Sequence, residues 1–259
     1  MATDKWCWSS IDKMMKQYKA IFIDWDDTIG DFHGAAKTAL KEVYDIYQLQ
    51  QYFASYDEFY QLYHTHNTQL WQLYGEDKVT KEYLWVDRFR WPILHGSNNL
   101  EGVDLQDIDQ LAYRIGEDFL RLTTAHFSLL PGAERMVRYL AKKYPLVVLS
   151  NGFIEVQHEK IERSGLSDCF AHVVLSEEVG CQKPNPRIYQ VALEKCGVSA
   201  EDVLMIGDSW SSDIQGAINA GIDQIWIRKN KEQGTKSQDT IEQTATYIVQ
   251  SLSEVMEIL

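Results

Sequence analysis

Short runs of consecutive apolar residues recur along the chain and mark its expected strands. Six of them cover residues 20–23, 146–149, 172–175, 203–206, 224–227 and, more weakly, 247–249. The first four end directly before Asp24, Ser150, Ser176 and Gly207. Runs that are apolar on both faces are typical of a parallel sheet that helices cover on each side. The pattern therefore predicts a buried, mainly parallel sheet.

Stretches with helix-start and helix-stop residues lie between these runs. The clearest begins after Asn185, a candidate N-cap, with Pro186 at the first helical position, and Gly197 closes it. Two further helices are predicted over residues 133–143 and 213–220. Alternating strands and helices from about residue 130 onward predict a doubly wound, Rossmann-like α/β core with a parallel sheet.

The first two predicted strands are too far apart for one strand–helix–strand unit, which needs only about 30 residues. The intervening chain has helical character over residues 35–51, 56–74, 80–91 and 107–124. We therefore expect an all-helical cap domain that is inserted after the first strand. The predicted division is an N-terminal extension at 1–17, an α/β core at 18–32 and 126–259, and a helical cap at 33–125.

Charge, hydropathy and cysteine content limit the expected partners and the expected cellular location. A formal charge of −13 disfavours nucleic-acid polymers as partners, because their binders normally carry a basic face. No apolar run approaches the roughly 20 residues that span a bilayer, so no membrane contact is expected. The four cysteines form no C-x-x-C pair, and no signal peptide is evident, which predicts reduced thiols in a cytoplasmic protein. Residues 1–13 have no evident place in the fold, so we expect translation to begin at Met14 or Met15.

The first candidate for chemistry follows the first predicted strand, where residues 24–28 read Asp-Trp-Asp-Asp-Thr. Residues two apart on an extended chain point the same way, so Asp24 and Asp26 can face one cleft. Ligands of open α/β sheets bind at this carboxyl edge. For this segment alone, an acidic turn that closes a strand remains the alternative interpretation.

Two further segments can bind phosphate. Ser150, Asn151 and Gly152 place a hydroxyl and a run of backbone N–H groups at a second strand end, although an ordinary turn has the same composition. Lys183 stands before Pro184, which restricts the backbone around it. A lone lysine is more often a solvated surface residue.

Asp208 and Asp213 surround the loop after a fourth strand. Taken alone, Asp213 can simply favour a helix N-terminus. All four segments, however, lie at predicted ends of elements. Together they indicate one site.

In their order along the chain, these segments resemble the motifs of the haloacid dehalogenase-like hydrolase superfamily. The matching residues are Asp24-x-Asp26-x-Thr28, Ser150, Lys183 and Gly207-Asp208 with Asp213, and the resemblance extends from about Tyr18 over nearly the whole chain. A narrower resemblance is to the noncanonical pyrimidine 5′-nucleotidase group, and it lies in residues 24–32, 130–133, 150–153 and 176–180. Many relatives outside this group have glycine where Asp27 stands.

The resemblance implies a phosphohydrolase in which Asp24 attacks phosphorus and becomes an aspartyl-phosphate. Asp26 would protonate the leaving oxygen and then activate water. The implied metal ligands are Asp24, the backbone carbonyl of Asp26, and Asp208, and this all-oxygen set favours Mg²⁺ over zinc. Asp213 is expected to support these ligands. The expected phosphate-binding residues are Thr28, Ser150, Asn151, Gly152 and Lys183.

The expected cap is rich in aromatic residues: Trp71, Tyr74, Trp85, Phe89 and Trp91. Such rings can stack on a nucleobase, but most rings in a helical insert form its own core. Arg88 and Arg90 are expected first as surface or ion-paired residues and only second as substrate contacts.

By resemblance, the first choice of substrate is a small phosphorylated metabolite, a pyrimidine nucleoside 5′-monophosphate. Sugar phosphates or phosphoglycolate come second. A phosphomutase and a non-catalytic binding protein on the same fold remain the rival functions. Carbon–halogen cleavage is disfavoured because dehalogenases of this superfamily lack an acid at the position of Asp26.

Overall fold

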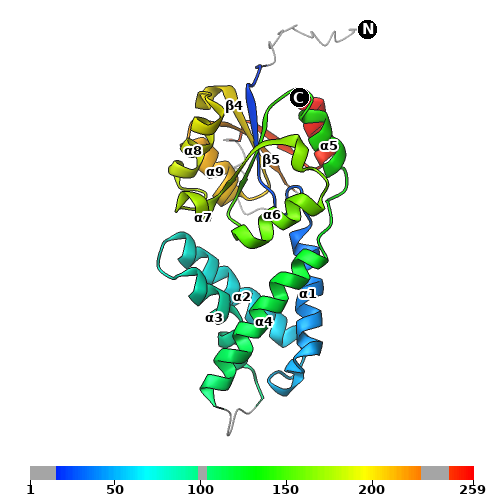
Figure 1. Ribbon diagram of the computed structural model, residues 1–259, viewed down its shortest axis with the longest axis vertical. Coiled ribbons are helices and arrows are strands. Elements are labelled where there is room, and N and C mark those ends of the chain that lie inside the picture. Colours follow the sequence, from blue (N-terminus) through cyan, green and yellow to red (C-terminus); the bar gives the residue numbers. More distant parts are fainter. Residues whose placement is uncertain (1–15, 99–103, 229–244) are drawn as a thin grey trace, which may run out of the picture.

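The computed structural model describes residues 16–98, 104–228 and 245–259. Most of the expected N-terminal extension, including the expected start at Met14 or Met15, lies outside the described residues. The chain forms two lobes, an α/β lobe and a helical lobe, which Figure 1 shows one above the other. No helix in the described ranges combines the length and the apolarity that crossing a bilayer requires.

The α/β lobe is built on one sheet of parallel strands in the order β3-β2-β1-β4-β5-β6. Its strands are β1 (Ala20–Ile23), β2 (Leu146–Ser150), β3 (Phe170–Leu175), β4 (Val203–Gly207), β5 (Asp223–Ile227) and β6 (Tyr247–Val249). In register, Ile21 of β1 pairs with Leu146 of β2 and Leu204 of β4. Each predicted run forms a strand, which confirms the predicted fold class.

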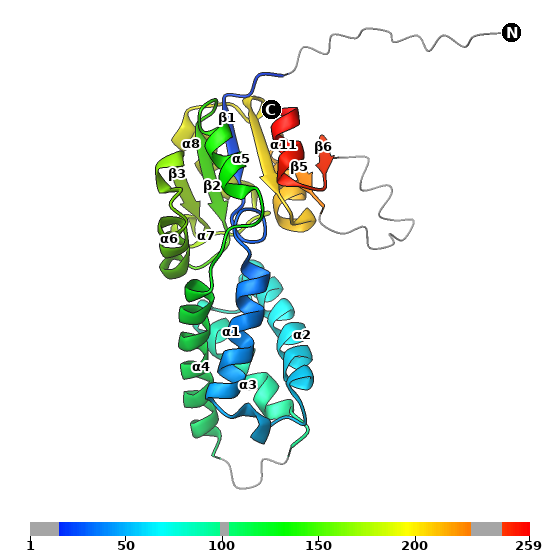
Figure 2. The ribbon, with the colours of Figure 1, turned by 90° about the vertical axis from the view of Figure 1, so that its right-hand side faces the viewer.

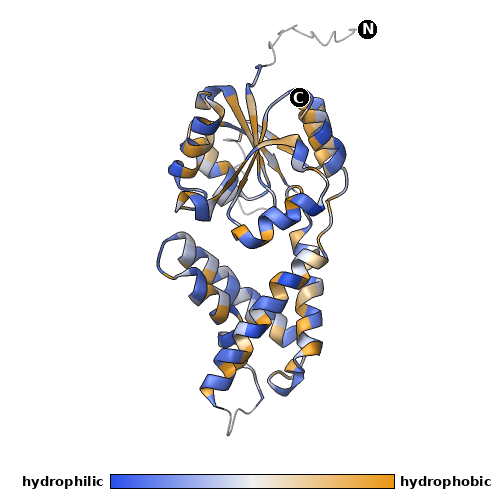
Figure 3. Ribbon diagram, in the orientation of Figure 1, coloured by the Kyte–Doolittle hydropathy of each residue, from blue (hydrophilic) through white to orange (hydrophobic). Residues whose placement is uncertain are grey.

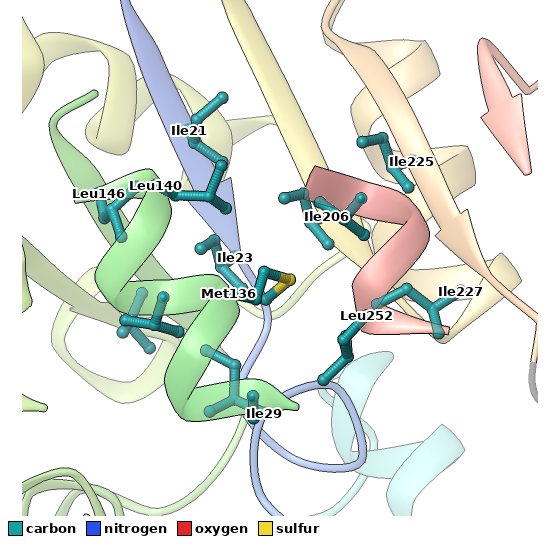
Figure 4. Packing of buried hydrophobic residues seen from close by; sticks show 14 of the residues in the cluster. Ile21, Ile23, Ile29, Met136, Leu140, Leu146, Ile206, Ile225, Ile227 and Leu252 are labelled. Atoms are coloured by element: carbon teal, nitrogen blue, oxygen red, sulfur yellow. The ribbon is translucent and has the colours of Figure 1, made fainter. Parts of the chain in front are cut away.

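Helices cover both faces of this sheet. They are α5 (Ala133–Leu140), α6 (Ile154–Arg163), α7 (Ser176–Val179), α8 (Pro186–Cys196), α9 (Gln215–Asn219) and α11 (Leu252–Ile258). Ile21 and Ile23 pack toward Met136 of α5 and Leu252 of α11, as Figure 4 shows. Phe22 points to the opposite face, in the cluster that α8 and α9 cover. Each fully buried side chain of this size contributes about 1.5–3 kcal/mol.

The ends of the helices refine the predictions. The start of α8 is confirmed, because the Asn185 side chain accepts a hydrogen bond from the backbone N–H of Arg187, and Gly197 closes the helix with φ +64°. The helix predicted at 213–220 begins earlier, with a π-helical turn over Trp210–Ile214 that continues as α9. Ser209 causes this shift, since its side chain caps the turn.

Four long helices form the helical lobe: α1 (Phe32–Ile46), α2 (Tyr56–Gly75), α3 (Lys81–His95) and α4 (Leu105–Ala125). The first ends at Ile46 rather than at residue 51, because Gln48 adopts a left-handed conformation with φ +52° and only a short 3₁₀ turn follows. The third continues past Trp91, with Pro92 inside it. The predicted division of the chain into a core and a cap domain, with boundaries at 32/33 and 125/126, stays a prediction.

The helical lobe has its own core, which Phe153 of the α/β lobe joins. Phe59, Phe89 and Phe119 are fully buried among the helices of the helical lobe. Strand β1 runs toward this lobe and continues into α1, as Figure 2 shows, so the carboxyl ends of the strands face it. Figure 3 shows hydrophobic strands inside the sheet and mixed surfaces on the helices. The sheet thus directs its ligand-binding edge at the helical lobe.

Candidate active site

Three neighbouring strands place the first site residues at one edge of the sheet. Because β1 lies between β2 and β4, Asp24, Ser150 and Asp208 leave adjacent strand ends. The backbone N–H of Asp24 donates to the carbonyl of Ile206 at 2.9 Å, which fixes the loop after β1 against β4. The parallel register thus brings together residues that are far apart in sequence.

Lys183 lies between two carboxylates. Its Nζ is 2.6 Å from Oδ1 of Asp24 and 2.7 Å from Oδ1 of Asp213. The Asn151 side chain positions this lysine, because its Oδ1 accepts from the Lys183 backbone N–H at 2.8 Å and its Nδ2 donates to the Lys183 carbonyl at 3.0 Å. Lys183 is buried and doubly paired, so the alternative of a solvated surface lysine does not apply to it. The Asn151 amide therefore holds the backbone of the loop that carries Lys183.

The burial of these charges shifts their proton affinities. Burial raises the pKa of Asp24 well above its usual range, Lys183 opposes this shift, and Asp213 and Asp208 add to it. Burial by itself would lower the pKa of Lys183, but the carboxylates of Asp213 and Asp24 outweigh it and the pKa is raised. Lys183 therefore stays a cation, and its charge offsets part of the effect of burial on the Asp24 carboxyl group.

Three acidic residues form a group that can hold a metal ion. One ligand atom each from Asp24, Asp208 and Asp213 lies within 4.8 Å of the other two. Thr28 Oγ1 donates to Oδ1 of Asp208 at 3.2 Å, and the backbone N–H of Ser209 donates to Oδ2 of Asp213 at 3.0 Å. A donor set made only of carboxylate oxygens fits Mg²⁺. Asp24 after β1 thus converges with Asp208 and Asp213 after β4, where the sequence predicts a metal site.

The Asp26 side chain faces helix α6 instead of this acidic group. Its Oδ1 accepts from Lys160 Nζ and its Oδ2 from Gln157 Nε2, both at 2.9 Å. Gln157 Nε2 also donates to Ser150 Oγ at 2.6 Å. A side chain at Gly152 would place its Cβ 2.5 Å from Gln157, so only glycine allows this approach. Gln157 therefore links the loops after β1 and β2.

Sequence reasoning missed Gln157 and Lys160, although both are buried. Lys160 is 3% exposed and lies over the Phe32 ring at 4.7 Å. The sequence carried one signal, because Gln157, Lys160 and Ile161 are spaced as one face of a helix; the structure buries all three. Two polar residues on the buried face of a helix beside a phosphate-binding motif indicate a site.

One cavity lies between the lobes, and most of the residues described above line it. Its α/β wall contains the charged residues described above, including Asp24, Asp26 and Lys160. Its helical wall is formed by Phe32, Tyr63, Asn67, Trp71, Arg88, Phe119, Leu120 and Thr123. The cavity therefore joins the acidic group to an aromatic surface.

The cap residues differ from the expectation in detail. Of the five aromatic residues predicted as candidates, Trp71 lines the cavity, where its ring stacks on Phe153 at 5.2 Å. Phe89 belongs to the core of the helical lobe, as most rings were expected to do. Arg90 is ion-paired with Asp109, as predicted. The same prediction is wrong for Arg88, which is 2% exposed and forms no ion pair within the described chain.

A family model of haloacid dehalogenase-like hydrolases matches residues 18–221. The pyrimidine 5′-nucleotidase YjjG of Escherichia coli is 30% identical over 92% of this chain and 96% of its own length. The pyrimidine 5′-nucleotidase PynA of Streptococcus pneumoniae is 29% identical over 93% of this chain and 95% of its own. Among solved structures, the hydrolase YfnB of Bacillus subtilis, bound to magnesium, has a TM-score of 0.76 at 28% identity and covers 94% of this chain and 99% of its own.

Proposed function

The chain belongs to the haloacid dehalogenase-like hydrolases, and we propose that it hydrolyses pyrimidine nucleoside 5′-monophosphates through an aspartyl-phosphate on Asp24. The observation that carries this proposal is the position of Asp24 in a cavity, paired with the Lys183 ammonium and close to the carboxylates of Asp208 and Asp213. The Asp24 carboxyl group is held in place by Lys183 and lies close to a place for a cation. Two relatives that match nearly the full chain are pyrimidine 5′-nucleotidases.

Charge neutralisation is the main requirement of the reaction. A carboxylate nucleophile and a phosphate ester repel each other, so the site must supply positive charge. Lys183 supplies one cation at 2.6 Å from the Asp24 carboxylate. Mg²⁺, when held by Asp24, Asp208 and the backbone carbonyl of Asp26 with Asp213 in support, supplies the remainder. Asp24 then displaces the ester oxygen, and water later cleaves the aspartyl-phosphate.

Asp26 is proposed as the proton donor to the leaving oxygen and as the base for the attacking water. Lys160 and Gln157 hold its carboxyl group in one orientation at the rim of the cavity. The Ser150 hydroxyl, the backbone N–H groups near Gly152 and Thr28 are proposed to bind the phosphate oxygens. The Ser150 loop is already fixed, because the N–H of Gly152 donates to Ser150 Oγ at 3.1 Å.

Phosphate release from a panel of esters tests the proposal. The purified protein, with Mg²⁺, is assayed against pyrimidine and purine nucleoside monophosphates, sugar phosphates and phosphoglycolate. Uridine or thymidine monophosphate should give the highest kcat/KM. A preference for phosphoglycolate or a sugar phosphate would refute the nucleotidase assignment, and isomerisation without phosphate release would indicate a mutase.

The Asp24→Asn variant tests the nucleophile. It should lower turnover of every ester by more than about 10³-fold, because a carboxamide cannot form the covalent intermediate. Asp57→Asn, an exposed acid on α2, is the matched control and should leave turnover unchanged. Ordinary steady-state turnover by Asp24→Asn would remove Asp24 from the mechanism.

A further inference from the structure

Arg88 is a buried cation that the described protein leaves without a partner. It lies on α3, lines the cavity and is 2% exposed. Its Nε and one terminal nitrogen are buried and form no hydrogen bond to any residue that the structure describes. Within the described residues, no carboxylate pairs with Arg88. The neighbouring Asp87 is paired with His66 and Arg90 instead.

Such an arrangement is unfavourable in the absence of a ligand. A buried charge is normally paired or fully hydrogen-bonded, because desolvation is expensive. The guanidinium carbon of Arg88 lies 5.0 Å from the Phe119 ring, 5.3 Å from Phe89 and 5.9 Å from Trp85. These rings stabilise the charge, but they leave the N–H donors unsatisfied. Burial lowers the pKa of Arg88, as expected for a charge without a carboxylate partner.

Asn67 adds a second unsatisfied group to the same wall. It lies on α2 and lines the cavity, and its Oδ1 is buried without a hydrogen-bond partner in the described ranges. An amide carries both a donor and an acceptor, so it complements an adjacent carbonyl and N–H in either orientation. A carboxylate ligand would also satisfy Arg88, but it has no N–H group and would use only the donor side of the amide.

We infer that Arg88 and Asn67 are specificity-determining residues that recognise the carbonyl and N–H edge of a planar nucleobase. Uracil and thymine present this edge, and Tyr63, Trp71 and Phe119 supply flat apolar surfaces around it. The inference rests on the proposed nucleotidase function and assigns its base recognition to the helical lobe. The phosphate end stays with the α/β lobe.

The Arg88→Met variant tests this assignment through a ratio of specificities. For each protein, kcat/KM is measured for uridine 5′-monophosphate and for ribose 5-phosphate, which lacks the base. In Arg88→Met this ratio should fall by about 10- to 100-fold, the range typical of one bidentate base contact. Asn67→Ala should lower it by about tenfold. Arg90→Met, an arginine paired with Asp109 outside the cavity, is the matched control and should keep the wild-type ratio.

Thermal melting separates recognition from a structural role. Replacement of an unpaired buried charge by methionine should leave the melting temperature equal or higher. A lower melting temperature with equal losses on both substrates overturns the inference, and so does an unchanged ratio. A loss confined to phosphoglycolate identifies a carboxylate site and also overturns it. If the wild-type protein releases phosphate from no nucleotide, the proposed function fails together with the inference. If the wild-type protein hydrolyses nucleotides but Arg88→Met keeps the wild-type ratio, only the inference fails.

Discussion

The two walls of the cavity differ in how their charged side chains are paired. On the α/β wall, the charged side chains pair with one another: Lys183 with Asp24 and Asp213, and Lys160 with Asp26. On the helical wall, the rings form a largely apolar surface, and Arg88 has no ion-pair partner among the described residues. The lysines of the first wall are already paired with carboxylates, whereas Arg88 on the second wall has no such partner in the part of the chain that the structure describes.

This difference assigns different tasks to the two lobes. Charges that are already oriented and paired need little reorganisation during reaction, which suits chemistry that is common to many phosphate esters. Unsatisfied donors on an apolar wall gain most from one particular ligand, because burial strengthens each hydrogen bond formed there. Chemistry and selectivity should therefore be separable by mutation.

The largest effect is expected on the α/β wall, in Lys183→Met. This change leaves Asp24 and Asp213 as uncompensated buried carboxylates, so we expect a loss of about 3–5 kcal/mol in the free energy of unfolding. Turnover should fall for nucleotides and ribose 5-phosphate alike. Urea denaturation and phosphate release measure the two effects, with Lys195→Met, an exposed lysine on α8, as the control.

The pH dependence of Lys183→Met has a defined sign. Burial raises the pKa of Asp24 in the folded protein, and loss of the lysine raises it further. The folded state then binds more protons than the unfolded state, so stability is lost as pH rises through the folded-state pKa and is fully regained below about 4, the unfolded value. A variant whose stability instead increases with pH in this range would contradict a buried, uncompensated Asp24.

An intermediate effect is expected from Mg²⁺. A ligand that binds only the folded protein stabilises it by about 2.7 kcal/mol at 100 times its Kd. The melting temperature of the wild-type protein should therefore rise with Mg²⁺. Asp208→Asn should reduce this shift, while Arg88→Met should retain it in full. Loss of the shift in Arg88→Met would show that the two walls are not independent.

The α/β wall could be predicted from the sequence because its residues directly follow strands. Strand ends at adjacent positions in a parallel sheet must converge, so the placement of Asp24, Ser150 and Asp208 follows from the apolar runs. The buried position of Lys183 did not follow, because it depends on contacts from Asn151, which comes from another loop.

The helical wall could not be predicted in the same way. The roles of Arg88 and Arg90 depend on how α3 is rotated against its neighbours, and two residues of one helix separated by one position face different directions. Arg90 reaches Asp109 and Arg88 reaches the cavity. From a single sequence, the rotation of α3 can be inferred only from its hydrophobic pattern. That pattern is weak, because aromatic residues lie on many faces of the helices in this lobe.

The smallest effect is expected where the two walls meet, at Lys81. Its Nζ, on the first turn of α3, lies 2.8 Å from a carboxylate oxygen of both Glu155 and Glu177 in the α/β lobe. Partly exposed ion pairs contribute at most about 1 kcal/mol, so Lys81→Met should raise KM up to about fivefold, and added salt should reduce the difference from wild type. Lys78→Met, which breaks a pair with Glu76 inside the helical lobe, is the control. A change confined to kcat would mean that Lys81 acts on the chemistry, and the separation of tasks between the walls would then fail at their junction.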